Sequence, residues 1–276
     1  LERLRRAPEH AAAWAYLDRW HRANLLRTRH RLDLDHALQV ERQYGPLDWR
    51  LPQAQAVYWG SLDPPSALII GGLDYGQLAR QSLENAVFYG RLIEDKEADT
   101  LVFAPNLALI GRVADAYDRA VASSLAPERD RVLHHEFLKR AIALLYSCGR
   151  EQEARRLHTW LCRVRGDQTE EFSDFIAENL FRLINFHFPQ SPAAAINDAL
   201  DQSCNWLAAG DPGRARGYDR FAELLWRRAT AVQPLPPLAE LREAAVARLS
   251  AASLPPSYQR RLAAGMAGIT EDQAAP

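Results

Sequence analysis

Residues 44–60 read Tyr44-Gly-Pro-Leu-Asp-Trp-Arg-Leu-Pro52 and then Gln53-Ala-Gln-Ala-Val-Tyr-Trp-Gly60. Glycine permits unusual backbone dihedrals and proline fixes φ, so Gly45 and Pro46 predict a tight turn. Asp48 is expected to cap the helix that follows, and Pro52 is tolerated in the first turn of that helix. The segment therefore predicts a rigid corner against which the neighbouring helices pack.

The same corner supplies the candidate partner-binding residues, which are Asp48, Trp49, Arg50, Tyr58 and Trp59. Two interpretations are open. In the first, Trp49 fills a gap in the core while Asp48 and Arg50 pin the turn. In the second, the side chains form a recognition surface, because Trp, Tyr and Arg dominate binding hot spots.

The composition is that of an ordinary globular protein. The 276 residues are 47% hydrophobic and 25% charged, which suits one large domain or two small ones. The formal net charge of -1 gives no general attraction to nucleic acid, so a nucleic-acid partner is not expected. No apolar run approaches the roughly 20 residues that span a membrane.

Apolar residues recur at intervals of three and four along nearly the whole chain, which predicts an all-α fold. Helices are expected at about 8–26, 34–44, 52–59, 73–93, 106–124, 127–148, 151–164, 172–188, 192–209, 213–229, 238–249 and 256–264. Residues 61–72 predict a loop with a buried apolar plug, residues 94–100 a charged turn, and residues 101–103 a return to the core. We expect an N-terminal helical region over 1–100, helical repeats over 101–268 and a disordered tail over 269–276.

Two segments share one pattern. Leu145-Tyr-Ser-Cys-Gly149 is followed by Ala154, and Trp206-Leu-Ala-Ala-Gly210 is followed by Ala215. Glycine can end a helix in a left-handed cap, and a small alanine lets the next helix approach closely, so both segments predict helical hairpins. The pattern resembles the tetratricopeptide repeat, although the two glycines are 61 residues apart and that family repeats about every 34. We expect antiparallel hairpins stacked as a tetratricopeptide-like solenoid; unrelated hairpins that share turn chemistry are the alternative.

A second resemblance covers about residues 42–164. The segments Tyr44-Gly-Pro-Leu-Asp-Trp-Arg50, Leu83-Glu-Asn-Ala86 and Pro105-Asn-Leu107 resemble those of an uncharacterised bacterial helical-repeat family. Members of that family resemble membrane-anchored proteins with a short N-terminal hydrophobic segment. The resemblance implies an anchor ahead of the domain and supplies no catalytic residues.

The N-terminal arm is rich in arginine and also carries aromatic residues. Such a helix can lie against an anionic membrane surface; a solvated helix face and a nucleic-acid contact are the alternatives. The chain begins with Leu1 rather than Met, so we expect either a cytoplasmic protein or one associated with a membrane through a preceding segment. The residues concerned are Arg3, Arg5, Arg6, Trp14, Tyr16, Arg19, Trp20, Arg22, Arg27, Arg29 and Arg31.

The sequence contains no familiar motif of a metal site or of a catalytic nucleophile. The cysteines Cys148, Cys162 and Cys204 form no CxxC motif and no Cys–His spacing typical of zinc, so they are expected to be buried thiols. Neighbouring residues on a helix point about 100° apart, so His134, His135 and Glu136 cannot all face one ion. No cofactor, metal ligand or catalytic residue is therefore expected.

Glu170, Glu171, Asp174 and Glu178 lie at helical spacing and are the candidates for acid–base chemistry. They also fit a solvated acidic first turn that complements the helix dipole. The sequence predicts a non-enzymatic scaffold that binds protein partners. A peripheral subunit of a membrane-associated assembly is one form that such a scaffold can take. The alternative is an all-α enzyme of the α/α-toroid type, which burial of these carboxylates in a cleft would favour.

Overall fold

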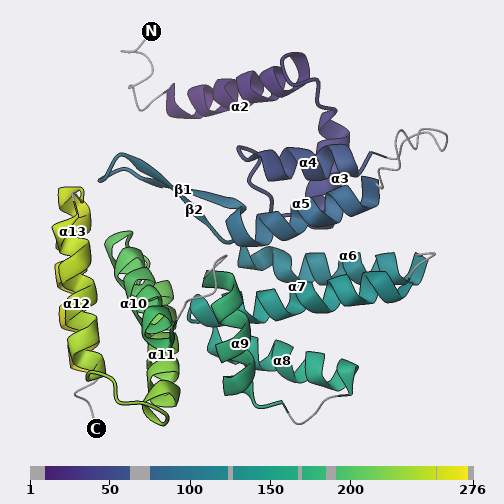
Figure 1. Ribbon diagram of the computed structural model, residues 1–276. Coiled ribbons are helices and arrows are strands. Elements are labelled where there is room, and N and C mark those ends of the chain that lie inside the picture. The colour runs from purple at the N-terminus through teal and green to yellow at the C-terminus, as the bar shows by residue number, and fades with distance from the viewer. Residues whose placement is uncertain are drawn as a thin grey trace.

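A computed structural model describes residues 10–62, 75–123, 127–166, 170–184, 191–252 and 254–272. These residues are mostly helical, which confirms the predicted helical class (Figure 1). The helices are α2 (Ala11–Thr28), α3 (Leu34–Tyr44), α4 (Pro52–Gly60), α5 (Tyr75–Tyr89), α6 (Ile110–Ser123), α7 (Pro127–Ser147), α8 (Glu151–Arg165), α9 (Phe172–Ile184), α10 (Pro192–Ala208), α11 (Pro212–Thr230), α12 (Leu238–Ala251) and α13 (Pro256–Asp272). A short 3-10 helix, η2 (Leu107–Leu109), precedes α6, and strands β1 (Arg91–Asp95) and β2 (Thr100–Ala104) form an antiparallel hairpin.

Helix α7 runs through the middle of the molecule and packs against α6, α8, α9 and α11 (Figure 1). Its apolar residues Phe137, Leu138, Ala141 and Ile142 are almost completely buried. Helices α3, α4 and α5 pack together on one side of this core, and α10 packs against α11, α12 and α13 on the other. The hydrophobic burial along α7 thus joins the N-terminal and C-terminal helices into one core.

The β-hairpin was not predicted from the sequence. Helix α5 ends at Tyr89 instead of continuing to residue 93. Gly90 lets the chain leave the helix, because a Cβ there would lie 2.1 Å from the carbonyl oxygen of Ala86. The prediction that residues 101–103 return to the core is wrong, since Leu101 and Phe103 on β2 are 62% and 55% exposed.

The hairpin turn is held from the far end of the chain. Arg261 on α13 binds the Asp95 carboxylate with both terminal nitrogens, at 2.5 Å and 3.0 Å. It also reaches Glu97, 2.9 Å away, and the Thr100 hydroxyl lies 3.3 Å from the Tyr258 hydroxyl. Paired charge-assisted hydrogen bonds of this kind are among the stronger polar contacts in proteins, so they fix the hairpin relative to α13.

The two predicted helical turns share one geometry. Gly149 ends α7 with φ at +77°, and Gly210 follows α10 with φ at +82°. The N–H groups of Gly149 and Arg150 donate to carbonyls at 3.0 Å and 2.8 Å, and those of Gly210 and Asp211 do the same at 3.0 Å and 2.8 Å. Both turns therefore have the left-handed cap that the sequence pattern predicted.

The two turns also touch one another. A Cβ on Gly149 would lie 2.8 Å from the Gly213 carbonyl oxygen, and one on Gly217 would lie 2.2 Å from the Ser147 carbonyl oxygen. Helix α11 therefore approaches the end of α7 through backbone atoms. Ala154 and Ala215, the small residues predicted to allow close helix approach, are completely buried.

Some expectations lie at or beyond the edge of the described residues. Helix α13 continues to Asp272, so residues 269–272, which we expected to be disordered, are helical. Residues 273–276 lie outside the described part of the chain, as do residues 63–72 of the predicted plug and residues 185–188 of the helix predicted over 172–188.

Candidate functional site

Asp48 joins the predicted corner to the hairpin. Its carboxylate accepts hydrogen bonds from the Arg50 side chain at 2.8 Å and 2.6 Å and from the backbone N–H of Leu92 in β1 at 3.0 Å. Arg50 also donates to the Leu92 carbonyl, 2.6 Å away. Asp48 and Arg50 therefore bind both polar backbone groups of Leu92, much as a neighbouring strand would.

The Arg50 hydrogen bond is the main cause of a low pKa at Asp48, which falls to about 2. The predicted role of Asp48 as a helix cap is wrong. The cap residue of α4 is Leu51, which has no side-chain hydrogen bond to the helix, while Pro52 occupies the first turn as predicted. Asp48 lies too early in the chain to cap α4, and its carboxylate is directed to the hairpin instead.

Trp49 and Tyr58 support the corner from inside. The indole N–H of Trp49 donates to Glu41 at 3.0 Å, and the same carboxylate accepts a bond from the Leu47 N–H at 3.3 Å. Tyr58 is 2% exposed, and its hydroxyl accepts a hydrogen bond from the backbone N–H of Asp33. Trp49 therefore holds the turn to α3, and Tyr58 holds α4 to the start of α3.

Trp59 differs from the other corner aromatics because it is 47% exposed. Its ring packs edge-on against Tyr58, with 5.0 Å between centroids. The structure thus brings Asp48, Trp49 and Arg50 together at the hairpin, and leaves Trp59 on the surface of α4.

A pocket of about 670 Å³ lies where the corner, the hairpin and the two helical turns meet. Its charged and polar lining residues are Asp48, Arg91, Asn106, Arg150, Asp211 and Arg214. Asn106 donates to the Pro46 carbonyl at 2.7 Å and so fixes the corner against the end of β2. Arg214 is only 7% exposed; its guanidinium stacks on Trp206 at 3.7 Å and lies 3.5 Å from Asp211. Within the pocket Arg214 pairs with Asp211, whereas Asp48 and Arg150 pair with Arg50 and Glu153, which do not line it.

The face of the hairpin opposite this pocket carries three apolar residues and one glutamate. The register pairs Leu92 with Phe103 and Glu94 with Leu101, and side chains alternate along a strand, so these four share one face. Leu92, Leu101 and Phe103 are hereafter the hairpin face. The exposure of Leu101 and Phe103 leaves it open to solvent over much of its area.

Helix α2 also exposes large apolar side chains. None of its residues is buried, and Tyr16, Leu17 and Trp20 are 70%, 49% and 59% exposed. The expected arginine-rich, aromatic helix is therefore present, with Tyr16, Leu17 and Trp20 in solvent. Arg3, Arg5 and Arg6 lie outside the described residues. In the described part of the chain, no helix is long and apolar enough to cross a membrane.

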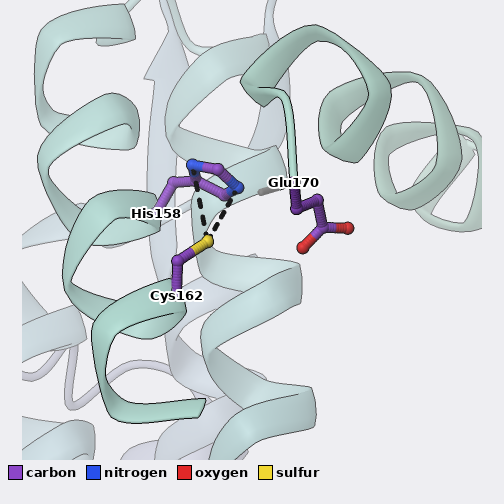
Figure 2. Close-up of side chains that lie close together, drawn as sticks. All are labelled: His158, Cys162 and Glu170. Carbon is purple, nitrogen blue, oxygen red and sulfur yellow. Dashed lines mark hydrogen bonds between the residues drawn. The ribbon is translucent and has the colours of Figure 1, made fainter. Parts of the chain in front are cut away.

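A cluster missed in the sequence lies at the C-terminal end of α8 (Figure 2). His158 and Cys162 are buried, and the Cys162 sulfur is 3.3 Å from His158 Nε2. Glu170, on the segment that leads into α9, brings its carboxylate to the same place; one ligand atom from each of the three residues lies within 4.8 Å of the other two. Their separation by four residues on α8 could have identified the His–Cys pair, because such residues share a helix face.

The remaining candidate carboxylates do not meet in one cleft, although Glu171 lines a pocket beside the cluster. Glu171, Asp174 and Glu178 are exposed, and Asp174 forms an ion pair with Arg228. The His134-His135-Glu136 triplet also spreads apart. The His134 ring stacks on Tyr117 at 5.2 Å, while Glu136 pairs with Lys139. Neither set forms the compact arrangement that acid–base or metal chemistry requires.

Comparisons with known protein families, with curated proteins and with solved structures found no match to this chain.

Proposed function

We propose that this chain is a non-enzymatic scaffold protein that binds a protein partner through the hairpin face. The observation that carries the proposal is the exposure of Leu101 and Phe103 side by side on β2. Adjacent apolar side chains in solvent are typical of interaction surfaces, since burying them releases water from apolar area.

The hairpin is well prepared for binding because its position is already fixed. Asp48 and Arg50 hold β1, and Arg261 holds the turn. A surface that is ordered before binding loses less conformational entropy when the partner arrives. Rigid support therefore favours a specific partner over a loosely attached one.

The backbone suggests the form of the partner segment. In the described part of the chain the sheet has two strands, so the outer edge of β2 pairs with no third strand there. An extended segment of a partner can add to such an edge through backbone hydrogen bonds and cover Leu101 and Phe103 with apolar side chains. We propose an extended apolar segment as the ligand of this surface.

The corner supports the hairpin in this proposal. The buried Tyr58 and the Trp49–Glu41 hydrogen bond favour a structural role for these aromatics. Exposure of Glu171, Asp174 and Glu178 favours the scaffold over an α/α-toroid enzyme. The matching turns after α7 and α10 support tetratricopeptide-like hairpins as the framework.

The proposal is tested by photocrosslinking in cells that make the protein. A photoreactive amino acid replaces Phe103, and a second sample carries it at Val232, which is 89% exposed and lies just after α11. We expect a discrete crosslinked protein from position 103 and none from position 232. Mass spectrometry then identifies the partner and the segment that was captured.

The matched variant is the double substitution Leu101→Ser and Phe103→Ser, with Val132→Ser and Val232→Ser as the control pair. We expect the first pair to abolish copurification of the crosslinked partner and the second pair to leave it unchanged. Circular dichroism checks that both variants remain folded. Undiminished recovery of the partner by the folded Leu101/Phe103 variant contradicts the proposal.

A second candidate function, contact with a membrane surface, is favoured by α2. Tyr16, Leu17 and Trp20 are exposed on a helix that also carries Arg19 and Arg22. Cosedimentation with vesicles of phosphatidylserine and phosphatidylcholine tests it. Binding that requires phosphatidylserine and is lost in Trp20→Ser supports membrane contact, while the absence of binding to either lipid contradicts it.

A further inference from the structure

The cluster of His158, Cys162 and Glu170 contains three different side chains that bind metals. His158 and Cys162 project from the same face of α8. Gly166 ends the helix with φ at +72°, and Glu170 lies beside the pair (Figure 2). The three ligand atoms therefore come from α8 and from the segment that leads into α9.

We propose that these three residues bind a zinc ion. Zinc accepts sulfur, nitrogen and oxygen ligands at about 2.0–2.3 Å in a tetrahedral arrangement, which places ligand atoms roughly 3.3–3.6 Å apart. The Cys162 sulfur and His158 Nε2 already lie 3.3 Å apart. A mixed sulfur, nitrogen and oxygen ligand set of this geometry suits zinc better than magnesium or calcium, which prefer oxygen alone.

Zinc binding would require only the Glu170 carboxylate to move closer. All three ligand atoms lie within 4.8 Å of one another, and any distance longer than the one between His158 and Cys162 is a distance to a Glu170 oxygen. Glu170 is only partly buried, and one of its oxygens accepts a hydrogen bond from Arg165 at 3.4 Å. A small change of its side-chain torsions brings an oxygen to the metal, while Arg165 orients the carboxylate as outer residues commonly do at metal sites.

Two aromatic rings pack around His158 and limit its motion. The rings of Phe175 and Phe172, with centroids 4.6 Å and 5.4 Å away, fix the imidazole plane. The histidine therefore loses little freedom when it becomes a ligand.

A pocket of about 410 Å³ opens beside the cluster and is lined by His158, Cys162 and Glu170 together with Thr159 and Glu171. Three protein ligands leave one position of a tetrahedral zinc site for water. The pocket gives that water room and gives the ion a path from solvent. The inferred site is thus of the open type with one exchangeable ligand.

The test uses the full chain after treatment with a chelator. Isothermal titration calorimetry with zinc is expected to show one site, and cobalt is expected to give a thiolate-to-cobalt charge-transfer band in the near ultraviolet. Cys162→Ser is expected to abolish the band. Glu170→Gln replaces the partly buried carboxylate by an amide of nearly the same size. We expect it to weaken zinc binding by roughly tenfold or more, because even residues that only orient metal ligands contribute about 10–100-fold to metal affinity.

Cys204→Ser is the matched control. Cys204 is also buried on a helix, and burial raises its pKa to about 11, so its thiol stays protonated and the cobalt band should not change. Circular dichroism of each variant separates loss of metal from loss of fold. The inference is overturned if the wild-type chain gives no thiolate-to-cobalt band, or if folded Cys162→Ser keeps it. Either result leaves the proposed partner surface unaffected, because the hairpin face shares no residue with this cluster.

Discussion

The Tyr58 hydroxyl oxygen accepts a hydrogen bond from the backbone N–H of Asp33, 2.8 Å away and 25 residues earlier in the chain. Asp33 is also the cap residue of α3, where its carboxylate accepts bonds from the N–H groups of Asp35 and His36. The hydroxyl of one buried ring on α4 therefore fixes the backbone at which α3 begins. This contact ties the start of α3 to α4.

Replacing Tyr58 by Phe tests that relationship. The substitution keeps the ring but removes the acceptor, which leaves the Asp33 N–H without a partner in a partly buried position. We expect the free energy of unfolding to fall by about 1 kcal/mol, the usual net value of a hydrogen bond in a folded protein. Urea denaturation followed by circular dichroism measures the change.

Tyr89→Phe is the matched control because Tyr89 is 53% exposed. We expect this surface change to stay within about 0.5 kcal/mol of the wild type. Equal effects at the two tyrosines would show that the Asp33 contact has no special importance for stability.

Asp48 makes the attachment of the hairpin dependent on pH. Its pKa is lowered from 3.8 to about 2, chiefly by the Arg50 hydrogen bond. A carboxyl with a lower pKa in the folded state stabilises the fold above its unfolded pKa, and this contribution is lost as the pH falls through the folded pKa. We expect Asp48→Asn to be less stable than the wild type at about pH 5, with the difference shrinking toward about pH 2.

Urea midpoints measured across that pH range check the prediction. Asp115→Asn, at an exposed position on α6, serves as the control for removing one carboxylate charge. A stability difference for Asp48→Asn that is the same at both ends of the range would mean that ionisation of Asp48 does not support the hairpin.

The close approach of α11 to α7 predicts a strong effect of a single methyl group. A Cβ on Gly217 would lie 2.2 Å from the Ser147 carbonyl oxygen, and backbone atoms cannot move aside as a flexible side chain can. We expect Gly217→Ala to lower the free energy of unfolding by about 2 kcal/mol or more, which is within the range for overpacked cores.

Gly111→Ala is the control, since a Cβ at this helical position on α6 meets nothing within 4 Å. Alanine favours helix over glycine, so this change should stabilise the protein by up to about 1 kcal/mol. Thermal unfolding of the two variants should therefore shift in opposite directions. A neutral Gly217→Ala would show that the two helices are farther apart than described.

The features that the sequence predicted well depend on neighbours in the chain. Gly149 and Gly210 end helices because a left-handed cap is set by local backbone preference, and Pro52 begins a helix for a similar reason. The helical class follows from apolar spacing in the same way. These signals need no knowledge of the tertiary structure.

The hairpin could not be predicted because its support is distant. Residues 91–93 were expected to end the helix over 73–93 and residues 94–100 to form a charged turn. Instead, Asp48 and Arg261 bind polar groups of β1 from 44 and 166 residues away. Residues 101–103 on β2 were expected to return to the core, but hydrophobic spacing does not say whether a neighbour is present to cover them.

The candidate site was predicted only in part. The Asp48–Trp49–Arg50 group was identified from its residue types, although its contact with Leu92 was not. The His158–Cys162 pair was missed because it matches no short cysteine motif and its two side chains meet only through the helical spacing of α8. Glu170 lies outside α8, so helical spacing alone does not place it beside the pair.

The contact between Asp95 and Arg261 has a consequence for synthesis of the chain. The ribosome makes the hairpin 166 residues before it makes the arginine that holds the turn. At about 5–20 residues per second, that interval is roughly 8–33 s. During translation the apolar hairpin face is therefore exposed without its later support, at the stage when a nascent chain is most open to chaperones and to premature association.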